Sequence, residues 1–432
     1  MQESDIPQFR ILETLIIAMA AVFVVWGTYG RSFGDTADSR LATVLSLTQD
    51  GSWYIDRPAG QEPNYFEQRT IDKVMVKGRL LSSKPPVLPL LMTGEYILVH
   101  KVFGWELLDE EDREKIIRFM SMTLVGGAYL LAVLFFVKTL RLFDVDPLTR
   151  VVLLFSLAFC TQLWGYGTNI NNHVPAAGML VVALYYALGL GSGRLPATPW
   201  RFALFGLTGG LVPTLDAPAG IFIAFAGLYV LAKHPRWTLL WVAPVAAIPV
   251  AVQCAVLWRT TGSSLPVQLH KEFYLYEASY WRNPRGIDAL NEPKLTYLFH
   301  MTFGRCGLFS LYPILFAGVA GFLRAIVKRD TPWRGYVLAG GAAFLILTAY
   351  YMTKNNYGGE AYGFRWYIVA MPVLLLMAAP VLSGLRKRWH WVFIGLMIGI
   401  SFYSAWECSQ APWAANRQWT CRVLGPRYGP WR

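Results

Sequence analysis

Apolar runs long enough to cross a membrane recur along almost the whole sequence, and they exclude most soluble folds. Only 15% of the residues are charged, against about 25% in an average soluble domain. One helix needs about 20 mostly apolar residues to cross a bilayer. We predict membrane spans near residues 11–28, 118–137, 150–166, 172–190, 202–214, 217–232, 237–258, 305–324, 335–353, 365–383 and 389–407. The sequence therefore predicts an all-α polytopic membrane protein with one domain over residues 1–432 and about 11 spans.

The charged residues between the runs predict the orientation. Lys and Arg gather in every second short loop, whereas the opposite short loops, "GTNINN" and "TLDA", contain none. Because cytoplasmic loops are enriched in Lys and Arg, the N-terminus should lie in the cytoplasm. Three segments are then extracytoplasmic: 29–117, 259–304 and 408–432. Residues 86–104 should form a helix in the outer interface, since Glu95, His100 and Lys101 interrupt their apolar run.

The formal net charge is +12, which in a soluble protein can indicate nucleic-acid binding. Here the basic residues lie in loops between spans, and the sequence contains no nucleic-acid-binding motif. We therefore expect membrane lipids with anionic headgroups, and not nucleic acid, as partners.

Two carboxylates follow the first span within one turn of each other. Asp35 and Asp38 occupy positions i and i+3, so on a helix they share a face. One interpretation is structural, with Asp35 as the N-cap of a helix and Asp38 near its positive end. The other is a general base at the membrane surface, where a carboxylate is partly desolvated.

A lysine before two prolines forms the second candidate, in "SSKPP". The prolines fix an extended backbone and open the next apolar helix, so Lys84 should lie at headgroup level. There it either binds a lipid phosphate as a point charge or extends its charge toward water from an apolar stem.

These motifs, in this order, resemble the GT-C membrane glycosyltransferases. The similarity is to the branch that contains the bacterial aminoarabinose transferase and the protein O-mannosyltransferases. It rests on the first span followed by Gly34 and Asp35, then "DGSWYID" and "SSKPP", and on "LWGYGTNINNHVPAAGMLVVAL", "FGRCGLFSLYPILFAGVAGF" and "YGGEAYGFRWYIVAMPVLLL". The resemblance implies a GT-C-like bundle in a bacterial inner membrane, with an acidic residue after the first helix and a Lys-Pro-Pro motif that approaches a lipid phosphate. Where relatives often have an acidic residue beside the Asp, this chain has Thr36.

Several residues in the other motifs could contact substrate. The stretch "NNYGGEAYGFRWY" places Glu360, Tyr362 and Arg365 at the outer mouth of a span, where Arg365 either binds phosphate or packs on neighbouring Trp366 and Tyr367. Arg305 lies similarly just outside its span, and His173 opens another span as a candidate substrate contact. Asp216, between two proline-interrupted half-length helices, is either functional or a helix cap.

The expected activity is that of an inverting glycosyltransferase. It would move a sugar from a polyprenyl-phosphate donor to a hydroxyl of a glycan, lipid or protein acceptor at the extracytoplasmic face. Asp35 would be the base, with Asp38 orienting it, binding acceptor or holding a divalent cation, although no third metal ligand is evident. Alternatives are a lipid-linked substrate transporter and a non-catalytic subunit of a larger complex. In the tail, Cys408 and Cys421 are either a disulfide or two free thiols.

Overall fold

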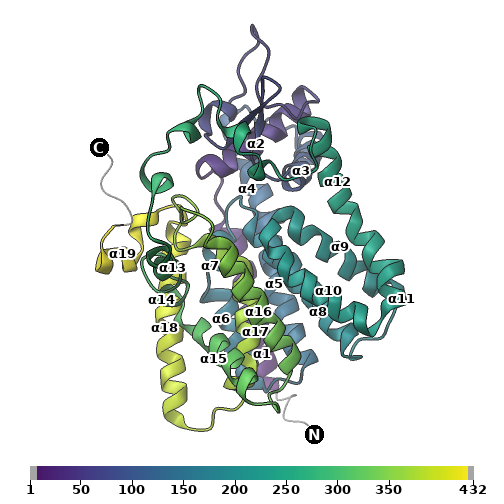
Figure 1. The fold of residues 1–432 in the computed structure, drawn as a ribbon, viewed down its shortest axis with the longest axis vertical. Coiled ribbons are helices and arrows are strands. Elements are labelled where there is room, and N and C mark those ends of the chain that lie inside the picture. The colour runs from purple at the N-terminus through teal and green to yellow at the C-terminus, as the bar shows by residue number, and fades with distance from the viewer. Residues whose placement is uncertain (1–6, 427–432) are drawn as a thin grey trace.

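The computed structural model describes residues 7–426 as a helical bundle with a layer of short elements over one end (Figure 1). The chain enters at the opposite end, below α1. The N-terminal part consists of α1 (Pro7–Gly27), α2 (Gly34–Gln49), β1 (Lys73–Val76), β2 (Arg79–Ser82), α3 (Val87–Phe103), α4 (Glu110–Met120) and α5 (Gly127–Leu142). A π-helical stretch, Ser121–Gly126, joins α4 and α5 into one continuous helix.

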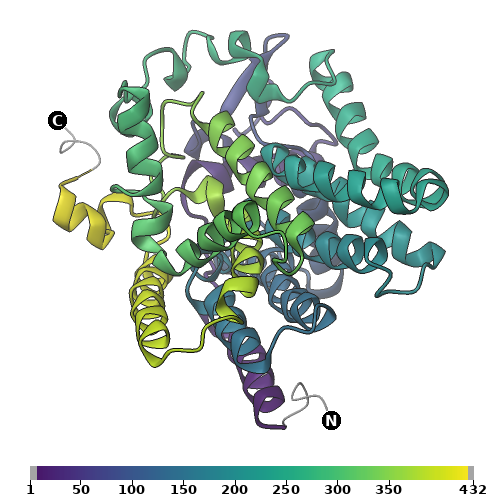
Figure 2. The ribbon, with the colours of Figure 1, turned by 60° about the horizontal axis from the view of Figure 1, so that its bottom comes forward.

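The remaining helices complete the bundle. They are α6 (Pro147–Phe159), α7 (Gln162–Tyr166), α8 (His173–Gly191), α9 (Pro199–Leu215), α10 (Gly220–Lys233), α11 (Pro235–Trp237), α12 (Ala243–Thr261), α13 (Lys294–Thr302), α14 (Leu308–Leu311), α15 (Phe316–Val327), α16 (Arg334–Tyr351), α17 (Met371–Leu382), α18 (Arg388–Gln410) and α19 (Trp419–Leu424). Figure 2 shows α9 to α12, in teal, on one side of the bundle and α18, in yellow, on the other.

The distribution of apolar side chains is that of a protein surrounded by lipid. Within residues 7–426, six helices are long and apolar enough to cross a membrane. The span Arg365–Leu382 is 83% buried inside the protein, whereas Pro235–Thr261 is only 11% buried and carries exposed Leu240 and Trp258. Exposed apolar helices of this kind are stable only against hydrocarbon. The predicted all-α polytopic membrane fold is confirmed, and the protein is a multi-pass membrane protein. The predicted number of about 11 spans is not confirmed by the six long apolar helices found within residues 7–426.

The break around "GGLVPTLDAPAG" is found as predicted, with one refinement. Two helices of 17 and 14 residues, α9 and α10, meet at Asp216. Pro213 does not make the break, because it lies inside α9. The backbone instead turns at Asp216, which has an extended conformation and is 6% exposed.

The small antiparallel hairpin of β1 and β2 was not predicted. Lys77 and Gly78 connect its strands with φ angles of 53° and 77°. Positive φ at both central residues is the type I′ geometry that matches the twist of two-residue hairpins. The hairpin holds the segment before Lys84 against α2, so it positions two of the candidate residues.

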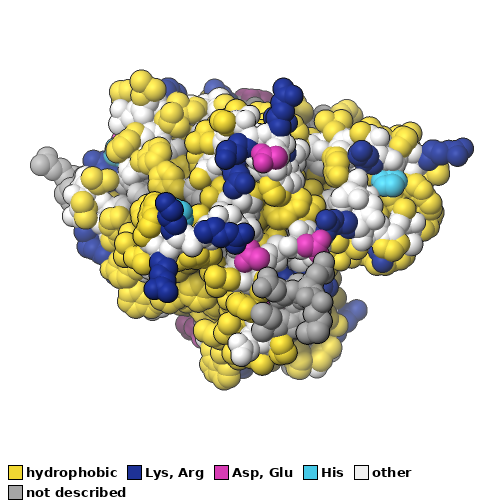
Figure 3. All heavy atoms as spheres, turned by 90° about the horizontal axis from the view of Figure 1, so that it is seen from below, with side chains coloured by type: hydrophobic (Ala, Val, Ile, Leu, Met, Phe, Trp, Pro, Cys, Tyr) yellow, Lys and Arg dark blue, Asp and Glu magenta, His cyan; other side chains and the backbone are white. Residues whose placement is uncertain are grey.

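At the end of the bundle where the chain enters, an ion triad fixes α1. Glu13 is completely buried and its carboxylate binds Arg141 of α5 and Arg150 of α6, the latter at 2.8 Å. Figure 3, a view onto this end, shows Lys and Arg side chains spread among apolar ones. This end corresponds to the loops predicted to be cytoplasmic.

Candidate active site

Asp35 is held by the segment that precedes β1. Its Oδ1 accepts a hydrogen bond from the Ile71 amide at 2.7 Å, and its carbonyl oxygen accepts one from the Thr70 hydroxyl at 2.8 Å. The N-cap interpretation is wrong, because α2 begins at Gly34 with Phe33 as its N-cap residue and no side-chain cap bond. The carboxylate is therefore bound across to another segment, and its position does not depend on capping its own helix.

Asp38 lies one turn further along α2 and is 4% exposed. Its Oδ2 is 3.6 Å from Arg69 Nε, and Ser32 also hydrogen-bonds to the carboxylate. Its Oδ1 is buried and has no hydrogen-bond partner within the described residues. A buried carboxylate oxygen without a donor is costly, which marks this side of α2 as a place where a polar group from outside the chain would be stabilised.

Lys84 forms an ion pair with Asp72. Its Nζ lies 2.6 Å from Asp72 Oδ2, and both side chains are largely buried. The ammonium group therefore does not extend into water, as the snorkelling interpretation required. Lys84 also interacts electrostatically with Asp35, which places the Lys-Pro-Pro motif beside the first carboxylate.

Arg40 is a fully buried cation that the sequence motifs did not single out. Its guanidinium donates to the Thr36 carbonyl at 2.6 Å and to Asn172 Oδ1 at 2.7 Å. Its Nε is buried and finds no acceptor in the part of the chain that the structure describes. No carboxylate forms an ion pair with it there, so its charge is only partly compensated, by the more distant Asp72.

Arg365 brings a third cation to the same place from near the end of the chain. The Arg365 guanidinium lies over the Trp413 ring at 4.7 Å. Its aromatic contact is therefore with the C-terminal segment, and not with Trp366 and Tyr367 as one of the two interpretations of the sequence had it. Its Nε is also buried without a partner among residues 7–426. It interacts electrostatically with Arg40, Lys84, Asp72, Asp288 and Asp216.

The conformation of the preceding loop depends on glycine. Gly363 has φ of 66°, and a Cβ atom there would collide with the Gln162 amide. Gly358 has φ of 84° and lies directly beside the Arg365 side chain. Because only glycine adopts such angles at little cost, these residues allow the loop to fold tightly behind Arg365.

His173 and Asp216 form a buried pair next to the cations. His173 Nδ1 lies 2.7 Å from Asp216 Oδ2, and His173 interacts electrostatically with Arg40 and Arg365. The adjacent Asn172 donates to the Leu215 carbonyl and accepts from Arg40. The break between α9 and α10 is thus joined to the start of α8 and to α2 through one polar network.

The segment after α12 contributes another carboxylate. Asp288 accepts hydrogen bonds from Tyr280 at 3.2 Å and Asn356 at 3.3 Å, and it interacts electrostatically with Asp35 and Arg365. Trp281 donates to the Ile71 carbonyl at 3.0 Å. The predicted extracytoplasmic segment 259–304 therefore packs on the predicted extracytoplasmic segment 29–117. The two ends of segment 259–304 are helical and belong to α12 and α13.

Burial sets the protonation behaviour of this cluster. It raises the pKa of Asp35, with the Asp72 charge adding to the rise and the Ile71 amide and Lys84 opposing it. It likewise raises the pKa of Asp38. Burial lowers the pKa of Lys84 and lowers that of Arg40 to about 10. A carboxylate with a raised pKa is a stronger base, and under-compensated cations attract an anion.

Three candidates lie apart from the cluster. Arg305 donates to the Leu424 carbonyl, and Tyr362 donates to Glu407 Oε2 at 2.8 Å, so both face the C-terminal segment. Glu360 is exposed in the loop before Arg365. The C-terminal segment folds back along the bundle, and the Pro412 carbonyl accepts hydrogen bonds from the Tyr166 hydroxyl and the Tyr362 amide. Within the described residues, Arg305 and Tyr362 contact this segment and not the residues around Asp35.

Of the two alternatives left open for Cys408 and Cys421, the structure has the one without a disulfide. Cys408 and Cys421 are both buried, and no disulfide joins them. Cys408 packs against Gly165, whereas Cys421 lies 3.2 Å from Gln418 Nε2. The two thiols therefore lie in different environments. Hydrogen bonds, such as the one from the Gln418 side-chain amide to the Arg305 carbonyl, hold the C-terminal segment in place.

The acidic groups do not form a set of metal ligands. Within residues 7–426, no three His, Cys, Asp or Glu side chains gather closely enough to hold an ion. Asp72 is paired with Lys84, and one oxygen of Asp35 is occupied by a backbone amide. The alternative of a divalent cation at Asp35 and Asp38 is not supported by the groups around them, and we derive no step through it.

Comparison with known proteins finds similarity in structure. No family model matches the sequence, and no curated protein matches it. The fold is similar to the apo Archaeoglobus fulgidus oligosaccharyltransferase, with 14% identity, a TM-score of 0.48, and coverage of 94% of this chain and 57% of the other. It is also similar to ArnT from Cupriavidus metallidurans in the apo state, with 14% identity and a TM-score of 0.47. The match to the same protein bound to undecaprenyl phosphate has 16% identity and a TM-score of 0.45. Each of these two matches covers 89% of this chain and 62% of ArnT.

The chain thus spans about three fifths of the length of the structures it matches. With identities of at most 16% and TM-scores below 0.5, these matches carry no argument about a reaction, which is made below from the cluster itself.

Proposed function

We propose that the protein is an inverting glycosyltransferase that takes its sugar from a polyprenyl-phosphate donor on the extracytoplasmic side of the membrane. The observation that carries this proposal is the convergence of Arg40, Lys84 and Arg365 around Asp72, whose neighbour Ile71 donates its amide to Asp35. The three cations come from α2, the Lys-Pro-Pro motif and the loop before α17, and only Lys84 forms an ion pair with an acidic partner within the described residues. Buried cations are normally paired, so this group supports binding of an anion such as a phosphate.

The unpartnered donors strengthen the case for phosphate. The Nε groups of Arg40 and Arg365 both lack an acceptor in the part of the chain described. A guanidinium group presents several N–H donors in one plane, and phosphate oxygens accept from it with favourable geometry. Lys84, which lies between β2 and α3, adds a point charge.

Asp35 would supply the base. The acceptor hydroxyl gives its proton to the Asp35 carboxylate as its oxygen forms a bond to the anomeric carbon. The bond from that carbon to the phosphate oxygen breaks, and the electron pair leaves with the polyprenyl phosphate. Attack opposite the leaving group inverts the anomeric centre. The three cations would stabilise the growing phosphate charge most strongly in the transition state.

The alternative of a transporter has a weaker basis. Transport requires a polar path across the bundle, whereas the network of Asp35, Lys84 and Arg365 lies at one end. A non-catalytic subunit would have no need for a base with a raised pKa beside unpaired cations.

The test uses the purified full chain in sealed liposomes with a polyprenyl-phosphate-linked sugar and a hydroxyl acceptor. Mass spectrometry follows free polyprenyl phosphate. We expect release by the wild type and a fall of about 10²- to 10⁴-fold in Asp35→Asn. The matched control is Asp50→Asn at the other end of α2, where the carboxylate pairs with Arg57. Donor that crosses the membrane intact would indicate a transporter, and equal release by Asp35→Asn would remove the base from the proposal.

A further inference from the structure

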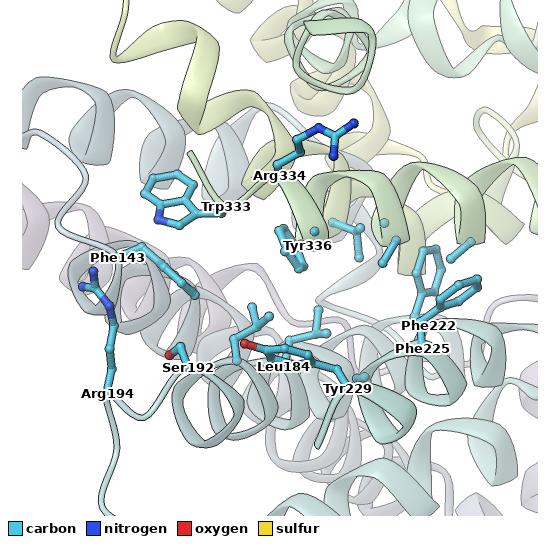
Figure 4. Close-up of a pocket in the computed structure, with 17 residues that line it drawn as sticks. Phe143, Leu184, Ser192, Arg194, Phe222, Phe225, Tyr229, Trp333, Arg334 and Tyr336 are labelled. Carbon is cyan, nitrogen blue, oxygen red and sulfur yellow. The ribbon is translucent and has the colours of Figure 1, made fainter. Parts of the chain in front are cut away.

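A second site lies at the opposite end of the bundle from Asp35. A cavity of about 440 Å³ opens between α8 and α10 on one side and α16 and α17 on the other. Its walls are apolar and include Leu184, Leu188, Phe222, Ala226, Ala343 and Val373. Figure 4 shows Phe222 and Phe225 at one end and Phe143, Trp333 and Arg194 at the other. The polar network of the candidate active site does not use any of these residues.

The end of the cavity near Trp333 is cationic. Arg194 and Arg334 both contribute to its lining. Arg194 donates to Asp144 at 2.6 Å and lies over the Phe143 ring, and Arg334 donates to the Ala325 carbonyl at 2.8 Å. The loop before α16 carries Lys328, Arg329 and Asp330, which do not themselves line the cavity. An apolar chamber with a cationic rim matches a molecule that has an apolar chain and an anionic head.

The start of α16 adds to this rim. The helix has 18 residues, no acidic residue in its first turn and no side-chain cap bond. Its N-cap residue Trp333 has φ of 52° and ψ of 30°, an unusual conformation for a residue with a side chain. The positive end of a helix favours an anion.

Tyr336 contributes an aromatic ring to the middle of the cavity wall. The Tyr336 hydroxyl is buried and has no hydrogen-bond partner within residues 7–426, and its ring lines the cavity. In Figure 4 it lies between the Trp333 end and the Phe222 end. Because the hydroxyl oxygen itself is buried, Tyr336 presents its ring, and not its oxygen, to the cavity.

We propose that this cavity binds one anionic glycerophospholipid from the membrane leaflet at this end of the bundle. One acyl chain fills the space between α10 and α16, against the Tyr336 ring, and the phosphate lies near Arg194, Arg334 and the first turn of α16. The proposal does not depend on the glycosyltransferase activity, because the binding involves none of the residues around Asp35.

The test is native mass spectrometry of the full chain exchanged into micelles with phosphatidylglycerol or phosphatidylcholine. We expect the wild type to retain one phosphatidylglycerol in preference to phosphatidylcholine. Ala339→Phe fills the cavity and should abolish retention, whereas Ala247→Phe, on the exposed face of α12, should not. Arg194→Gln and Arg334→Gln should each reduce the preference about fivefold. Arg201→Gln, an arginine at the same end that does not line the cavity, is the matched control.

Each variant is checked for folding by its elution profile and melting temperature. If Ala339→Phe fails to fold, Ala226→Leu replaces it, since Ala226 also lines the cavity. Equal retention by the filled variants and the wild type would overturn the proposal. Retention without preference for phosphatidylglycerol, or recovery of a polyprenyl phosphate in place of a phospholipid, would overturn it as well.

Discussion

Lys84 Nζ lies 2.6 Å from Asp72 Oδ2, and the residue before Asp72 donates its amide to Asp35. One short segment, residues 70–72, therefore fixes both the carboxylate and the cation of the candidate site. The Ser83 amide donates to the Asp72 carbonyl at 3.0 Å, which continues the β1–β2 ladder up to Lys84. The hairpin and residues 70–72 thus hold Lys84 and Asp35 near each other, with Asp72 and Ile71 as the residues that each of them contacts.

Asp72→Asn should destabilise the protein because Lys84 loses its acidic partner while both side chains stay largely buried. We expect the free energy of unfolding to fall by about 2–4 kcal/mol, measured as a lower melting temperature. Adding Lys84→Gln should recover part of the loss by removing the uncompensated charge. Asp50→Asn, which breaks a more exposed pair with Arg57, should change stability by less than about 1 kcal/mol. Equal effects of Asp72→Asn and Asp50→Asn would contradict this account of the pair.

Asp35→Asn should leave the protein at least as stable as the wild type at pH 7. Burial raises the pKa of Asp35 above its ordinary value of 3.8. The folded state therefore binds this proton more tightly than the unfolded state, and stability falls as pH rises between the ordinary and the raised value. Asn avoids that cost and can still accept from the Ile71 amide.

The measurement is melting temperature as a function of pH, and the difference between variant and wild type should shrink below pH 3.8. Asp56→Asn is the control, because Asp56 forms a 2.8 Å ion pair with Arg79 and its loss should lower stability at pH 7. A clear drop for Asp35→Asn at pH 7 would show that the carboxylate is mainly structural.

Arg365→Lys should weaken donor binding although it keeps the charge. Lysine lacks the planar group that lies over Trp413 and the Nε donor that is buried without a partner among residues 7–426. A lost charge-assisted hydrogen bond corresponds to an increase of about tenfold or more in the donor KM. Arg305→Lys is a matched control, because Arg305 contacts Leu424 away from the cluster. If both variants raise KM equally, Arg365 has no special role.

Glu13→Gln should lower stability strongly without altering donor affinity. Glu13 is completely buried and binds Arg141 and Arg150 at the end of the bundle away from Asp35. Leaving these arginines without their carboxylate should cost about 3–5 kcal/mol. Glu111→Gln, whose carboxylate is 84% exposed beside Lys115, should have almost no effect. The comparison uses melting temperature together with binding of polyprenyl phosphate.

Hydropathy predicted the helices well because membrane spans obey a local rule. The predicted span 172–190 corresponds to α8, His173–Gly191, within one residue. The hairpin was missed because its strands have four residues each and only Lys77 and Gly78 mark the turn. Such short strands are stabilised by contacts with α2, a helix too far away in the sequence for a local pattern to include it.

The candidate site was predicted in part. Asp35, Lys84 and Arg365 were singled out, and the structure brings them into one network. Arg40 was missed, although its helix neighbours at i±3 and i±4 are Ala37, Thr36, Thr43 and Val44, an unusually small and apolar setting for arginine. Asp72 and Asp288 carried no such local signal, because only tertiary packing brings them close.

The central claim is that Lys84 and Arg365 act on one bound phosphate. The most direct measurement is the affinity for polyprenyl phosphate of Lys84→Gln, Arg365→Gln and the double variant, in full-length protein held well below the lowest melting temperature of the set. We predict that each single variant weakens binding about tenfold, and that the double variant departs from additivity by more than about 0.5 kcal/mol because both cations contact the same anion. Wild-type affinity in both single variants would contradict the claim.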